Sequence, residues 1–255
     1  FKYIDELFEN LKGKHYSINR IEKVLKKINE ITVNEQFVST KANVEESLIG
    51  NKLDLSFEIK GLKKGKVTLN KLNDTSFVKI DSFIVNGDKT INFKYHLEEP
   101  EILFLDLDVN DGSEARSLSF FAENKTIHIT TSLENYGFDI IVKGSINDSL
   151  LRDYKSINKK FNDEKLNLFE RSFENSRLNN SDSLIIIENQ IVNINKRQFL
   201  HNANYAVRNS KYELSPYIAI TDLIDSKKIL DTVYKSLNKE IKNSKYAEQL
   251  KKLIN

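Results

Sequence analysis

Apolar and polar residues alternate along the chain between Leu55 and Lys143, in short runs that mostly end in Gly, Asn or Asp. Alternation with a period of two is typical of half-buried β-strands, and Gly and Asn favour tight turns because they tolerate positive φ. The pattern predicts about eight antiparallel strands, arranged as a β-sandwich or a partly open barrel. The strands are expected at 55–59, 67–72, 77–85, 91–95, 102–109, 118–122, 126–130 and 138–143.

The hydrophobic period changes to three or four residues after Gly144. This spacing is typical of a helix with one apolar face. Two helices, at 150–173 and 184–194 with a polar break at 179–182 between them, are predicted to form an antiparallel helical hairpin. Ser215 is expected to be the N-cap of the next helix. Three shorter helices are expected at 216–224, 229–237 and 244–254.

The first fifty residues are polar and give weaker signals. Ser17 is a candidate N-cap for a helix through Glu30, whose apolar side is formed by isoleucine and leucine at helical spacing. We expect this helix to pack on the body of the protein, with a membrane-surface helix as the alternative. A strand is predicted at 36–40. The predicted fold is therefore α+β, with an N-terminal helical or tether segment at 1–50, an antiparallel β-domain at 51–145 and a helical domain at 146–255.

Composition narrows the classes of protein that the chain can represent. The 39 basic residues are nearly balanced by 37 acidic ones, whereas a nucleic-acid-binding protein usually carries a clustered basic excess. No apolar run is long enough to predict a membrane-spanning helix. Cysteine is absent, which excludes disulfides, thiolate catalysis and cysteine-ligated zinc. The chain also lacks methionine, so we expect a processed chain, from which a signal peptide has been removed, or a fragment of a longer protein.

One loop resembles a calcium site in its sequence. Asp106, Asp108 and Asn110 alternate, Asp111-Gly112 follows, and Glu114 lies beyond. An EF-hand loop needs Gly directly after the third ligand and a bidentate Glu at position twelve. Here Asp111 intervenes and position twelve is Ser117. A structural turn is therefore favoured over a calcium site.

Histidines, sequons and aromatic residues are the other candidates for chemistry. The histidines lack the spacing of a helical metal site, although the two in predicted strands are able to meet in space. The sequence contains no nucleophile motif and no phosphate-binding loop. The Asn-x-Ser/Thr triplets are expected by chance in a chain this rich in Asn. Strand aromatics are expected mostly in the core, with a carbohydrate or peptide groove as the alternative. We predict no catalytic, cofactor-binding or metal-binding residue. The residues considered are His15, His96, His128 and His201; Asn73, Asn124, Asn147 and Asn179; and Tyr95, Phe104, Phe120, Phe121, Tyr136 and Phe138.

Three runs of the sequence stand out: IKGLKKGKVTLNKLNDTSFVKIDSFIVNGDKTINF (59–93), KKFNDEKLNLFE (159–170) and SPYIAITDLID (215–225). They resemble a Bacteroidota family of envelope lipoproteins. The family carries a domain of unknown function that often precedes a thioredoxin-like module in thiol–disulfide interchange proteins. The resemblance is collinear over about 53–255, although the thioredoxin module and its Cys-x-x-Cys motif are absent. It implies a lipidated cysteine upstream of Phe1, and so a lipid anchor rather than a membrane-spanning helix.

These observations lead to three hypotheses about function. The first is a non-catalytic envelope lipoprotein-type binding module, part of or attached to an outer-membrane assembly, with a protein partner and no nucleic acid. The alternative is the accessory N-terminal region of a thiol–disulfide oxidoreductase whose catalytic module lies outside this chain. A reading frame that continues past Asn255 into Cys-x-x-Cys distinguishes the second from the first. A calcium-dependent ligand-binding domain, built on the loop between Asp106 and Glu114, is a third and weaker hypothesis.

Overall fold

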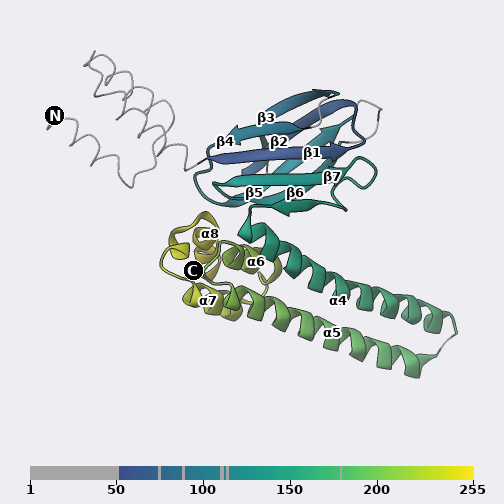
Figure 1. Ribbon diagram of the computed structural model, residues 1–255. Helices are drawn as coiled ribbons and strands as arrows, with labels where there is room; N and C mark the ends of the chain where they lie inside the picture. Colours follow the sequence, from purple (N-terminus) through teal and green to yellow (C-terminus); the bar gives the residue numbers. More distant parts are fainter. Residues whose placement is uncertain (1–51, 74–75, 88–89, 110–111, 113–114, 179) are drawn as a thin grey trace, which may run out of the picture.

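The structure is a computed structural model, and it describes residues 52–255 except 74–75, 88–89, 110–111, 113–114 and 179. Eight strands are followed by a helical region, with the hairpin of α4 and α5 extending away from the body (Figure 1). The strands are β1 Leu53–Lys60, β2 Lys64–Asn73, β3 Ser76–Asn86, β4 Ile91–Tyr95, β5 Glu101–Asp108, β6 Arg116–Ala122, β7 Thr126–Ser132 and β8 Ile141–Lys143. The helices are α4 Ile146–Arg177, α5 Ser181–Arg208, α6 Leu214–Asp222, α7 Lys227–Ser236, the short 3₁₀ helix η1 Ile241–Asn243 and α8 Lys245–Ile254.

The strands form two four-stranded sheets, in the orders β4-β1-β7-β8 and β3-β2-β5-β6. Their inner faces share one core because alternate residues of each strand point inward, as Leu53, Leu55 and Phe57 do in β1. The predicted α+β class, a β-sandwich followed by helices with a hairpin, is confirmed. All strand pairs in the second sheet are antiparallel. In the first sheet β1 pairs with β7 in parallel, against our prediction, because the chain crosses to the other sheet between them.

A buried polar joint connects the sandwich to the helices. Ser145 caps α4, and its side chain accepts a hydrogen bond from the backbone N–H of Asp148. Asp148 is fully buried, accepts from the backbone N–H of Phe121 in β6 at 2.9 Å, and pairs with Arg152. Asn147 donates to Glu123 beside β6. The first turn of α4 is thus hydrogen-bonded to the sheet, which fixes the direction in which the hairpin leaves the body.

Gly144 lies between the last strand and this joint. Its φ is +104°, and a Cβ atom built there would lie 2.1 Å from the carbonyl oxygen of Thr126. The chain therefore turns from sheet to helix at a point where it touches the neighbouring backbone. Only glycine has both the conformational freedom and the small size for this position.

A second core lies among the helices. Phe121 points out of the sandwich and contacts Tyr217 and Tyr246 edge to face, so β6 contributes to both cores. Helices α6, α7 and α8 pack around the base of the hairpin (Figure 1). Farther out, a small apolar cluster formed by Leu168, Ile187 and Ile194 joins the two long helices. Because α4 has 32 residues, it is about 48 Å long at 1.5 Å per residue.

Two local predictions were wrong. The last strand was expected at 138–143 but begins at Ile141, and Phe138 lies in the preceding turn with 93% of its surface exposed. Ser215 is not an N-cap, because α6 begins one residue earlier, at Leu214. The backbone N–H of Leu214 donates to Asn147 of α4, so a distant side chain satisfies this helix end. The predicted helix from Ser17 and the strand at 36–40 lie outside the described residues.

Candidate functional site

The calcium-like loop is only partly described. Asp106 lies in β5 and accepts a hydrogen bond from Nδ2 of Asn70 in the neighbouring strand β2. Asn110, Asp111 and Glu114 lie outside the described residues. Among the residues that the structure describes, no group of three or more His, Cys, Asp or Glu side chains is placed to hold a metal ion.

The three histidines that the structure describes do not gather at one place. His15 lies outside the described residues. His128 lies on β7 opposite Ser56 of β1, whereas His96 follows the end of β4, so that β1 separates the two. His201 lies on α5 and stacks on Tyr154 with ring centroids 6.2 Å apart. Burial, together with the charge of Arg208, lowers the pKa of His201, which favours a neutral ring in this aromatic cluster.

The strand aromatics and the sequons are mostly structural. Phe120, Phe121 and Tyr136 are buried, as the alternation predicts, so they do not line a groove on the sheet. Tyr136 donates its hydroxyl to a backbone carbonyl of β5. Asn147 is buried in the joint described above, and Asn124 is hydrogen-bonded to the backbone of Leu97. Asn179 lies outside the described residues.

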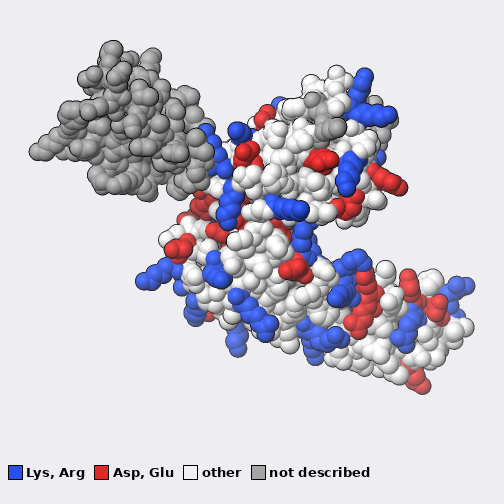
Figure 2. Space-filling view, in the orientation of Figure 1, with Lys and Arg blue, Asp and Glu red and all other residues white. Residues whose placement is uncertain are grey.

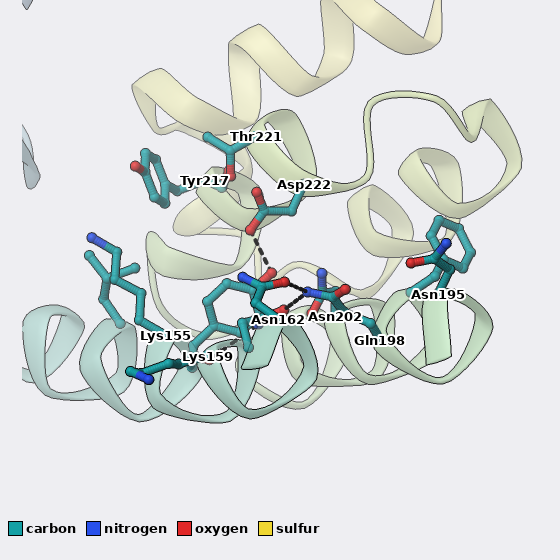
Figure 3. Close-up of a pocket in the computed structure, with 13 residues that line it drawn as sticks. Lys155, Lys159, Asn162, Asn195, Gln198, Asn202, Tyr217, Thr221 and Asp222 are labelled. Atoms are coloured by element: carbon teal, nitrogen blue, oxygen red, sulfur yellow. Dashed lines mark hydrogen bonds between the residues drawn. The ribbon is translucent and has the colours of Figure 1, made fainter. Parts of the chain in front are cut away.

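A cleft in the helical region was not predicted. It is a cleft of about 600 Å³ where α4, α5 and α6 meet at the base of the hairpin (Figure 3). The lining residues are mainly polar, and five of them carry amide side chains. The lining residues are Leu151, Tyr154, Lys155, Asn158, Lys159, Asn162, Asn195, Gln198, Phe199, Asn202, Tyr217, Thr221 and Asp222.

A hydrogen-bonded chain fixes the amides of this cleft. Nε2 of Gln198 donates to Oδ1 of Asn158 at 2.7 Å and to Oδ1 of Asn162 at 3.3 Å. Oε1 of Gln198 accepts from Nζ of Lys165 at 2.9 Å, and Asn158 in turn donates to the backbone carbonyl of Tyr154. These bonds link α4 to α5. They hold the planar amide groups in place, which lowers the entropic cost of binding a ligand.

The ionisable groups of the cleft differ in their partners. Tyr154 donates its hydroxyl to Asp222 at 2.5 Å, and burial, followed by this contact, raises the pKa of Tyr154. Lys159 pairs with Asp163 at 2.6 Å. Lys155 has no hydrogen bond or ion pair within the described part of the chain. Burial and then the charge of Arg152 lower the pKa of Lys155.

Asn202 is the most informative residue of the cleft. Only 7% of its surface is exposed, and its Oδ1 atom has no hydrogen-bond partner within the described residues. A buried acceptor without a donor costs about 1–3 kcal/mol, so its presence needs an explanation. The sequence contains a signal for this site, because Asn158 and Asn162, like Gln198 and Asn202, are four residues apart. Amides at that spacing lie on one side of a helix.

The same side of the hairpin becomes apolar farther from the body. We define the distal apolar stripe as Leu166, Phe169, Phe173, Ile185 and Val192. The exposed fractions of these five side chains range from 48 to 67%. At 100° per residue, the stripe residues of α4 lie on the side of that helix that carries Lys155 and Asn162, and those of α5 on the side that carries Phe199. The cleft and the stripe are therefore consecutive parts of one surface.

The hairpin carries charges of both signs. On the side of the molecule shown in Figure 2, basic and acidic side chains lie beside one another along the hairpin. Several form pairs four residues apart or across the helices, such as Lys159 with Asp163 and Arg197 with Glu164. An extended phosphate backbone needs a field of one sign, which this side lacks. None of the described helices is long and apolar enough to cross a membrane.

Comparison with known proteins gives a family match over part of the chain. No curated protein is significantly similar to this chain. The family model matches residues 53–151, which contain the whole sandwich and the start of α4. Of the residues that line the cleft, all but Leu151 lie beyond this match. Residues 53–151 of this chain are accordingly similar to the family described as a domain of unknown function, DUF4369.

Proposed function

We propose that this chain is a non-catalytic interaction module of the bacterial envelope, which docks on a protein partner through its helical hairpin. The distal apolar stripe is the observation that carries this proposal. Contiguous exposed apolar surface on a folded protein is commonly a site of interaction. The envelope location is supported by the resemblance to envelope lipoproteins, and attachment to an outer-membrane assembly is the task that follows from it.

The stripe is large enough to contribute substantially to binding. Phe169 and Phe173 are 54 and 67% exposed, and Leu166 is 58% exposed. Full burial of such a side chain contributes about 1.5–3 kcal/mol, so covering the exposed half of all three contributes roughly 3–4 kcal/mol. Arg177 lies over the ring of Phe173, with its guanidinium carbon 6.0 Å from the ring centroid. The stripe thus combines aromatic anchors with an arginine, which are enriched at protein interfaces.

The hairpin is also held firmly enough to present this surface. The buried joint at Asp148 fixes the start of α4 to the sheet. The hydroxyl of Tyr205 in α5 donates to the backbone carbonyl of Leu150 in α4 at 2.8 Å. These contacts fix both helices at their base. A pre-ordered arm loses less conformational entropy on binding than a flexible one.

The chemistry of the cleft favours binding over catalysis. Thr221 is the only Ser or Thr among the lining residues, and its hydroxyl donates to the carbonyl oxygen of Tyr217 rather than to a base. Burial raises the pKa of Tyr154 and of Tyr217, so both phenols stay protonated near neutral pH. Activation of a nucleophile needs a base within hydrogen-bond reach. The cleft groups described here instead act as fixed hydrogen-bonding partners.

The experiment compares two surfaces of the hairpin in a pull-down from a mild-detergent extract of native envelopes. The double variant Phe169→Glu, Phe173→Glu places charge on the stripe. Ile186→Glu is the matched control, because Ile186 is 58% exposed and lies on the opposite side of α5. We expect recovery of one specific partner to fall at least tenfold for the double variant and to be unchanged for the control. Far-UV circular dichroism checks that both remain helical.

Two results would overturn the proposal. The first is equal recovery of partners by the double variant and wild type. The second is a change from dimer to monomer in light scattering of the double variant, which would identify a second copy of the chain as the occupant. Cell fractionation tests the location separately, since recovery of the native protein from the cytoplasm contradicts an envelope module.

A further inference from the structure

We propose that the cleft between α4, α5 and α6 binds a neutral carbohydrate. This site is separate from the distal apolar stripe and does not depend on protein docking. Figure 3 shows Asn162, Gln198 and Asn202 close together, with Asp222 facing them from α6, and Lys155 and Asn195 toward opposite ends. These positions supply both hydrogen-bond donors and acceptors, as the hydroxyl groups of a sugar require, and their charges are balanced, which suits a neutral ligand.

The first match is the mixture of free donors and acceptors. Oδ1 of Asn202 is a buried acceptor that lacks a donor. The ammonium of Lys155 and the hydroxyl of Tyr217, both at the same cleft, make no hydrogen bond within the described residues and supply donors. A sugar hydroxyl donates one hydrogen bond and accepts two. A polyhydroxyl ligand therefore satisfies both kinds of group, whereas an anion without an O–H group, such as sulfate, leaves Asn202 without a donor.

The second match is electrostatic. Lys159 is paired with Asp163, which leaves Lys155 and Asp222 as the opposite charges facing the cleft. Arg152, which lies near Lys155, is itself paired with Asp148. The charges of the lining residues therefore cancel, whereas Lys165, which donates to Gln198 from outside the lining, keeps its positive charge. A neutral ligand suits this balance, because a net charge on the ligand would have to be desolvated without a surplus of opposite charge.

The third match is the shape and the wall of the cleft. Its volume of about 600 Å³ lies within the usual range of small-ligand sites, about 300–1,000 Å³. Phe199, Tyr217 and Tyr154 contribute aromatic surface to the lining. Such surface covers the apolar face of a sugar ring while the amides contact its hydroxyl groups. The bonded amides of Gln198 and Asn158 supply a rigid floor.

The test uses isothermal titration of the whole chain with a panel of neutral saccharides, from glucose, galactose and N-acetylglucosamine to their disaccharides. We expect at least one to bind in the micromolar to low millimolar range. Asn202→Leu removes the unpartnered acceptor at nearly constant volume and should weaken binding at least tenfold. Because it also removes an unsatisfied polar atom, its melting temperature should not fall. Asn195→Ala, at the exposed rim, should weaken binding several-fold without affecting folding.

Asn189→Leu is the matched control, since Asn189 lies on α5 outside the cleft, and it should leave binding unchanged. Three results would overturn the proposal. They are no binding by any neutral saccharide at 10 mM, binding that neither Asn202→Leu nor Asn195→Ala reduces, and tighter binding of tetraglycine or inorganic phosphate than of every saccharide. A pull-down that fails to find a protein partner leaves this test unaffected, because the stripe and the cleft have no residue in common.

Discussion

The substitution Asp148→Ala is expected to lower the free energy of unfolding by about 3 kcal/mol, because Asp148 connects the sandwich to the hairpin. Its side chain is fully buried and accepts hydrogen bonds from the backbone N–H of Phe121 and from the guanidinium of Arg152. Removing the carboxylate leaves the buried N–H of Phe121 without an acceptor, which costs about 1–3 kcal/mol.

The loss of the ion pair with Arg152 lowers the free energy of unfolding by a smaller amount. Losing one partner of a buried ion pair costs about 3–5 kcal/mol, but the Arg152 side chain is 31% exposed and regains water, which reduces this contribution to about 1 kcal/mol. The lost interaction of a carboxylate with the N-terminus of α4 adds roughly 0.5 kcal/mol. Together these contributions give the expected loss of about 3 kcal/mol.

Urea unfolding followed by far-UV circular dichroism measures this loss, since the chain has no tryptophan for fluorescence. With a slope of about 3 kcal/mol per molar urea, the midpoint should fall by about 1 M. Asp153→Ala is the control, because Asp153 is exposed on the same helix and should change stability by less than about 0.5 kcal/mol. A loss below 1 kcal/mol for Asp148→Ala, or equal losses for both variants, would refute the role assigned to the joint.

Three further predictions concern stability and ligands. In urea unfolding, Gly144→Ala should lower the free energy of unfolding by roughly 3–5 kcal/mol, because the cost of positive φ and the cost of overlap with Thr126 add together. Gly87→Ala should lower it by only about 1–2 kcal/mol, because Gly87 has a φ of +90° but open space around it. Equal costs for the two variants would contradict the close approach of Gly144 to Thr126. Burial opposes ionisation of Glu123, but the hydrogen bonds from Asn147, Lys125 and Ser145 prevail and lower its pKa below 4.5. The stabilising contribution of the Glu123 carboxylate is therefore present above pH 4.5 and is lost as the pH falls through the lowered pKa. The difference in unfolding free energy between wild type and Glu123→Gln should accordingly shrink on acidification. A constant difference from about pH 7 to about pH 3 would be inconsistent with this pKa. Calcium should leave the melting temperature unchanged, and a saturable rise would revive the site at Asp106.

The sequence predicts the features of this fold that are local. Alternation in β1 and the switch in period near Gly144 follow from which side chains are buried, so the sandwich and the hairpin were both predictable. The parallel pairing of β1 with β7 was not, because it joins segments about seventy residues apart and depends on the path through the other sheet. Ser215 illustrates the same limit, since a typical capping residue was displaced by the distant Asn147.

The candidate site was visible in the sequence only as a pattern. Amides four residues apart on both long helices indicate a polar side, yet such a side is usually solvated. That this one forms a cleft depends on α6, which brings Tyr217 and Asp222 over the hairpin. The missing partner of Asn202 depends on burial by all three helices, which the sequence does not show. The helical period likewise predicts an apolar side that includes Phe169 and Phe173, but it does not show that these two side chains face outward.

Site-specific photo-crosslinking in native cells tests the central claim, that the hairpin is the surface that binds a partner. A photoreactive phenylalanine analogue is placed at Phe173 on the stripe or at Ile84, which is 75% exposed on the edge strand β3. An edge strand is the other kind of surface that could accept a partner. The account predicts one discrete crosslinked protein from position 173 and none from position 84. A crosslink from position 84 alone, or only crosslinks between copies of this chain from position 173, would contradict it.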